Sequence, residues 1–67
     1  MTRDQAIQIQ AKALAAVEEL VSVLEIVKDA VAPEEYERVK KSIGLSIGAI
    51  EMHVNVPLYQ QFPDLEN

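Results

Sequence analysis

Residues 33–56, which read PEEYERVKKSIGLSIGAIEMHVNV, decide the fold of this chain. Apolar residues recur here at spacings of three and four, which places them along one face of an α-helix. This first stripe consists of Tyr36, Val39, Ile43, Ile47, Ile50 and Val54. A second stripe, rotated from the first by roughly 120–180°, consists of Leu45, Ala49, Met52 and Val56. One neighbouring helix can cover only one stripe, so the second stripe predicts an additional partner.

The preceding segment, residues 3–31, has the features of the helix that covers the first stripe. It contains neither Gly nor Pro, and good helix formers dominate its composition. Thr2 and Gln5 have the spacing of a capping box, which predicts that the helix begins near residue 3. Its apolar residues alternate by four and three, forming a face made of Ile9, Ala13, Val17, Leu20, Leu24, Val27 and Val31.

The two helices are expected to meet at a short turn, Ala32-Pro33. Proline disfavours helix in the residue before it and suits the first position of a new helix. Because no long polar linker intervenes, the first helix (about 3–31) and the second helix (about 33–55) should lie antiparallel.

The C-terminal segment, residues 56–67, begins with a helix breaker. Pro57 has no backbone N–H, so the second helix should stop or kink near this position. Leu58, Tyr59 and Phe62 are too apolar for a free tail, and we expect them to fold back as a short helical turn. Residues 63–67 are expected to form an irregular end.

Length and composition favour assembly. The chain has 67 residues, 49% of them hydrophobic, and no cysteine. A single domain of this size has a marginal core, and without disulfides such domains commonly gain stability by oligomerising. We therefore predict an all-α, antiparallel two-helix hairpin that dimerises into a four-helix bundle. The predicted interface consists of Leu45, Gly48, Ala49, Met52 and Val56. The alternative is that the C-terminal segment of the same chain covers the second stripe.

Gly44 and Gly48 lie on one side of the second helix. Glycine in a helix interior costs about 1 kcal/mol relative to alanine. The pair predicts either the close approach of another helix, which is the first helix or a second copy of the chain, or a groove for a different partner.

The charge balance disfavours several kinds of partner. Eleven acidic against six basic residues give a formal net charge of −5. An acidic surface repels phosphate backbones and anionic membranes, so nucleic-acid and membrane binding are not expected. The longest apolar run, residues 13–17, is far shorter than the ~20 residues of a membrane helix. The first residues show no cationic start followed by an apolar block, and the expected location is the cytoplasm.

No residue pattern predicts catalysis or a bound metal or cofactor. His53 is the only histidine, and Ile50 occupies the position three residues before it. The Glu-x-x-His pattern of di-iron bundles is therefore missing. The chain also has no glycine-rich phosphate loop and no serine in a nucleophile motif. We expect no enzymatic activity.

Tyr59 and Phe62 are three residues apart and share a face of the expected C-terminal turn. They either cap the end of the bundle or form a docking surface for another protein.

The expected architecture resembles that of Rop-type hairpins, small RNA-binding proteins that dimerise into a four-helix bundle. The likeness covers length, helix count and the Met-Thr start that is followed by charged residues and glutamine. It implies a homodimer, but the basic RNA-contacting face has no counterpart here. The leading functional hypothesis is a non-catalytic protein-interaction or regulatory module that acts as a homodimer. The alternatives are a binder of small apolar ligands or lipids, using a pocket between protomers, and a Rop-like nucleic-acid regulator.

Overall fold

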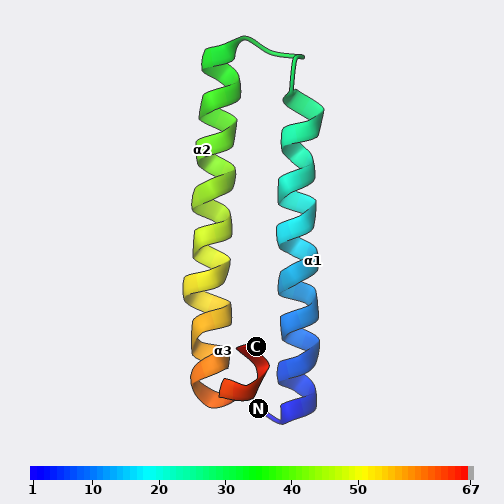
Figure 1. Cartoon of the computed structure of the whole chain (residues 1–67), viewed down its shortest axis with the longest axis vertical. Coiled ribbons are helices and arrows are strands. Elements are labelled where there is room, and N and C mark those ends of the chain that lie inside the picture. Colours follow the sequence, from blue (N-terminus) through cyan, green and yellow to red (C-terminus); the bar gives the residue numbers. More distant parts are fainter. Residues whose placement is uncertain (67) are drawn as a thin grey trace.

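The computed structural model describes residues 1–66 and folds as a helical hairpin with a folded-back C-terminal segment (Figure 1). The long helices α1 (Arg3–Val27) and α2 (Pro33–Ile50) lie side by side and run in opposite directions. The chain as a whole is a rod of 45 × 18 × 16 Å. The predicted antiparallel two-helix hairpin is confirmed.

The start of α1 is fixed by the predicted capping box. The backbone N–H of Gln5 donates to the Thr2 hydroxyl at 3.2 Å, and the backbone N–H of Thr2 donates to the Gln5 side-chain oxygen at 2.8 Å. Both N–H groups would otherwise lack a partner inside the helix. The pair therefore explains why the helix begins at Arg3.

The first helix ends at Val27, before the expected end near residue 31. Asp29 has a φ of 61°, in the left-handed region, which an α-helix cannot include. Ala32 is extended, with φ −62° and ψ 151°, as the following proline requires. The apolar pattern extends four residues past the end of the helix, to Val31, which is half-buried in the turn. The turn is therefore longer than the predicted Ala32-Pro33.

The second helix continues past its predicted end through a π-helical segment, η1 (Glu51–Asn55), into α3 (Val56–Gln61). The N–H of Val56 donates to the carbonyl of Glu51, five residues earlier. A π-turn shifts the hydrogen-bond pattern by one residue, and Pro57, which has no N–H, follows at the start of α3. Proline therefore changes the helix type instead of ending the helix.

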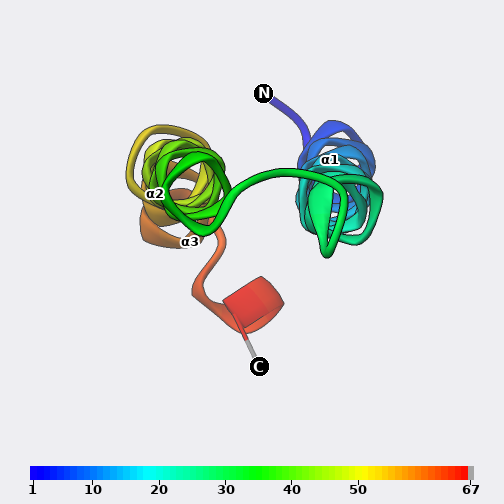
Figure 2. The same cartoon turned by 90° about the horizontal axis from the view of Figure 1, so that it is seen from above.

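The C-terminal segment folds back as predicted. We call residues 56–66, which comprise α3 and the 3₁₀-helix η2 (Pro63–Glu66), the tail. Viewed along the helices in Figure 2, the end of the tail lies beside the gap between α1 and α2, on one side of the plane that contains them. The expectation of an irregular end is wrong for residues 63–66, which form η2. Asn67 lies outside the described residues.

The enclosed core is small. Within the described chain, the buried hydrophobic residues are Ala6, Ala13 and Leu58, and Leu58 is only 2% exposed. The first stripe faces α1 and is half-buried for most of its length. The second stripe remains open to solvent, since Leu45 is 67%, Met52 65% and Val56 40% exposed. The alternative in which the tail covers the second stripe is therefore wrong.

Leu58 should contribute most to the stability of the tail, because it is the one large side chain that the fold encloses. We expect Leu58→Ala to lower the free energy of unfolding by about 2–4 kcal/mol. Urea titration followed by far-UV circular dichroism, at one fixed protein concentration, measures the change. Ile26→Ala is the matched control, because Ile26 is 72% exposed and its truncation should change stability by less than about 0.5 kcal/mol. Equal losses for the two variants would contradict this assignment.

Candidate interaction surfaces

The second stripe occupies the side of α2 that faces away from α1. At 100° per residue, Leu45 and Met52 project about 140–160° from Ile47, which lines the inter-helix groove. Gly48 and Ala49 are also exposed. The predicted interface residues on α2 therefore share one open surface. Val56 belongs to α3 and is displaced from their line by the π segment.

The glycine pair has no neighbour within the chain. A Cβ atom placed at Gly44 or at Gly48 would meet no atom within 4 Å outside its own helix. The prediction that the first helix approaches the glycines is therefore wrong, because α1 packs on the first stripe instead. A second copy of the chain and a groove for a different partner remain as the two predictions for this surface.

An apolar groove runs between α1 and α2 on the same side as the tail. Its volume is about 510 Å³. Its walls are incomplete, because Leu14 is 60% and Ile7 42% exposed. The lining residues are Ile7, Gln10, Ala11, Leu14, Val17, Ile47, Glu51, Asn55 and Tyr59.

The polar residues of this groove are concentrated where α2 changes into the π segment. The Asn55 side-chain nitrogen donates to a carboxylate oxygen of Glu51 at 2.9 Å. The Asn55 side-chain oxygen is buried and has no hydrogen-bond partner among the described residues. A buried acceptor without a donor costs free energy.

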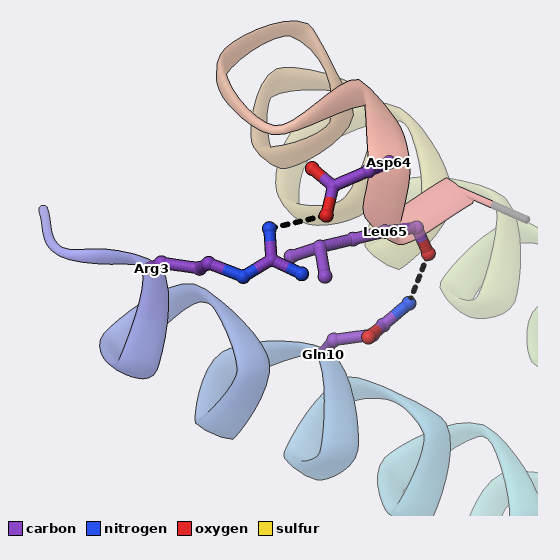
Figure 3. Close-up of polar contacts among 4 residues, drawn as sticks. All are labelled: Arg3, Gln10, Asp64 and Leu65. Atoms are coloured by element: carbon purple, nitrogen blue, oxygen red, sulfur yellow. Dashed lines mark hydrogen bonds and ion pairs between the residues drawn. The ribbon is translucent and has the colours of Figure 1, made fainter.

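Three polar contacts hold the tail to the start of α1. The Arg3 guanidinium pairs with the Asp64 carboxylate, and the Gln10 side-chain nitrogen donates to the Leu65 carbonyl at 2.7 Å (Figure 3). The same nitrogen donates to the Tyr59 hydroxyl at 3.4 Å. The side chains of Arg3 and Asp64 are each 54% exposed, and such surface pairs contribute little. Gln10 is therefore the main polar anchor of the tail.

Gln10 was not singled out by the sequence. The available signal was a glutamine between apolar neighbours, close to the edge of the helix face that packs on α2. Tyr59 and Phe62 are half-buried in the tail, and the choice between capping the hairpin end and docking another protein stays a prediction.

The described part of the chain contains neither a metal-binding cluster nor a membrane-spanning helix. Within residues 1–66, no group of three or more His, Asp or Glu side chains is arranged to hold a metal ion. No helix in that range is both long enough and apolar enough to cross a bilayer.

Comparisons with protein-family models, with curated proteins and with solved structures find no match to this chain. The resemblance to Rop-type hairpins therefore remains one of architecture. The surfaces have to be interpreted from their own geometry.

Removing the Gln10 side chain should loosen the tail without unfolding the hairpin. Loss of one partly buried hydrogen bond costs about 1 kcal/mol, or roughly five-fold in the opening equilibrium. In Gln10→Ala we expect the amides of Phe62 and Leu65, which bond within the tail, to exchange about five-fold faster with deuterium. Gln8→Ala, at an exposed position of the same helix, is the control. Unchanged exchange in Gln10→Ala would show that apolar packing alone holds the tail.

Proposed function

We propose that this protein is a non-catalytic interaction module that acts as a homodimer, with the second stripe of α2 at the interface. The observation that carries the proposal is the exposure of Leu45 and Met52, 67% and 65%. Both residues lie in the middle of a long helix, away from its fraying ends. Large apolar side chains exposed together in this way mark association surfaces.

The total surface area supports a second copy. The chain exposes 5008 Å², whereas a compact monomer of its 7.5 kDa mass exposes about 4,200 Å². The excess follows from the elongated shape, in which each long helix has one long neighbour. A standard protein interface buries about 800 Å² on each partner. A second copy would thus bring the exposed area of each protomer close to the value normal for its mass.

The free energy gained by burying the second stripe is comparable with the free-energy cost of association. Full burial of a leucine or methionine side chain contributes about 1.5–3 kcal/mol, so covering the exposed part contributes about 1–2 kcal/mol. Two such residues in each of two copies contribute about 4–8 kcal/mol. Association costs about 4–15 kcal/mol in lost freedom. The stripe can therefore form the centre of an interface, while neighbouring polar and apolar contacts supply the rest.

A dimer leaves the other side of α1 available for a macromolecular partner. That side carries acidic residues, Glu18, Glu19 and Glu25, all of them exposed. Electrostatic complementarity favours a basic protein surface over nucleic acid there. This is the sense in which we propose a regulatory or adaptor role.

Sedimentation equilibrium tests the homodimer directly. We expect wild-type protein at tens of micromolar to have twice the 7.5 kDa chain mass. Met52→Lys places a charge within the proposed interface and should weaken dimerisation by more than about ten-fold. Ile26→Lys is the control, because Ile26 is 72% exposed and lies on α1, outside the proposed interface. A wild-type monomer at this concentration would contradict the proposal.

The groove favours a second candidate function, the binding of a small apolar ligand. Its volume of about 510 Å³ lies within the range of ligand pockets, roughly 300–1,000 Å³. Its apolar walls, with Gln10 and Glu51 among the lining residues, suit a molecule with an apolar body and a polar end. This candidate leaves the outer side of α2 free, so it is compatible with the proposed homodimer.

Native mass spectrometry of freshly purified protein tests ligand binding. A bound apolar molecule should appear as a discrete mass increment that Leu14→Glu removes, because Leu14 lines the groove. The control is Ile26→Glu, a charge of the same kind placed away from the groove. Identical spectra for these variants, without an increment in wild type or after addition of long-chain alcohols, would argue against this candidate.

A further inference from the structure

We propose that the second copy packs antiparallel against α2, with Leu45 of each copy placed over Gly48 of the other. This inference rests on the proposed homodimer and specifies its geometry. It is drawn from the arrangement of apolar, small and charged residues around α2.

Four residues of α2 and its extension form a single line. Lys41, Leu45, Gly48 and Met52 recur at spacings of four, three and four, so they project within an arc of about 60°. This is the spacing of residues in a helix–helix seam. A two-fold axis between positions 46 and 47 sets Leu45 against Gly48 of the other copy, and Lys41 against Met52.

Each contact in this seam is sterically suitable. The space outside Gly48 is empty, since a Cβ atom there would meet nothing within 4 Å, and it can receive the exposed Leu45 side chain. The aliphatic stem of Lys41 can cover Met52 while the ammonium group stays in water. The helix-destabilising glycine is then compensated by a contact that exists only between copies.

Charge selects the antiparallel direction. Glu51 of one copy would lie within about 3 Å, along the helix axis, of Lys40 and Lys41 of the other copy. In a parallel pair each of these residues would meet its own like charge. Within residues 1–66 the ion pair is Arg3–Asp64, so neither lysine nor Glu51 is already paired. The hydrogen bond from Asn55 occupies one Glu51 oxygen and leaves the other for the second copy.

The tail also restricts where the second copy can lie. It occupies one side of the α1–α2 plane near the start of α1 (Figure 2). A hairpin laid flat over that side would collide with it. A copy placed against the outer side of α2 meets no such obstacle.

Charge reversal tests the arrangement in the full-length protein. We expect Glu51→Lys to weaken the dimer at least about ten-fold, because all the charged residues at each end of the seam would then be lysines, which repel one another. The double variant Lys40→Glu/Lys41→Glu should weaken it similarly, and combining all three changes should restore the wild-type dissociation constant to within about three-fold. Glu19→Lys on α1 makes the same charge change as Glu51→Lys elsewhere and should have little effect. Sedimentation measures dimerisation, and circular dichroism checks that each variant is folded.

The glycine contact has a separate test. Gly48→Leu should abolish dimerisation without reducing the helix content of the protomer, because the space that the new side chain fills is empty in one chain. Unchanged dimerisation would overturn the seam.

Cysteine cross-linking tests the direction, since the natural chain has no cysteine. A mixture of Lys41→Cys and Met52→Cys proteins should form a disulfide between the two variants on mild oxidation. Neither variant should cross-link with itself, because like positions would be about 16 Å apart along the axis. Efficient self-cross-linking would indicate a parallel pair. A wild-type dimer that is insensitive to all these changes would overturn this inference but not the homodimer, whereas a wild-type monomer would overturn both.

Discussion

The contact between α1 and α2 is the constraint on which the rest of the molecule depends. Two long helices touch along a line, so each buries one side and leaves most of its circumference in water. The radius of gyration, 14.7 Å, exceeds the ~11 Å of a compact chain of this length. Apart from Leu58, the buried hydrophobic residues within the described range are the alanines Ala6 and Ala13. These small residues permit the helices to approach but enclose little apolar volume.

The sequence was sufficient for the hairpin because the relevant signals are local and strong. The capping pair Thr2 and Gln5, the proline at residue 33 and the apolar periodicity each act within a few residues. The end of α1 was less predictable, because it depends on a left-handed conformation at Asp29, which aspartate tolerates but does not require. Gln10 was missed for a related reason. Its importance comes from Leu65, a residue 55 positions away, whose carbonyl no periodicity could place.

The surfaces likewise divide into features that local sequence patterns predict and features that depend on residues far apart in the chain. The second stripe was visible in the sequence, and the structure places Leu45 and Met52 in solvent. The glycine pair was ambiguous, because spacing alone cannot say which helix approaches it; the empty space around both glycines removes α1 from consideration. The groove could not be foreseen, since it requires the tail, α1 and the π segment together. The hairpin thus has two unlike surfaces, one completed by its own tail and one left open.

The π segment has a consequence for the tail that side-chain chemistry does not reveal. A π-turn accommodates one extra residue, which is roughly 100° of rotation in a helix of 3.6 residues per turn. Leu58 follows Ile50 by eight positions, but with one position absorbed it is offset by two whole turns and points the same way as the first stripe. In a regular α-helix, without the π-turn, the same eight positions would rotate Leu58 by about 80°, away from the interior that encloses it. The burial of the tail thus depends on the backbone geometry of Glu51–Asn55 as much as on residue type. Deleting one of these residues would leave seven positions between Ile50 and Leu58, which is about two turns of a regular α-helix, so the tail would keep its side of the hairpin and the π-turn would no longer be needed.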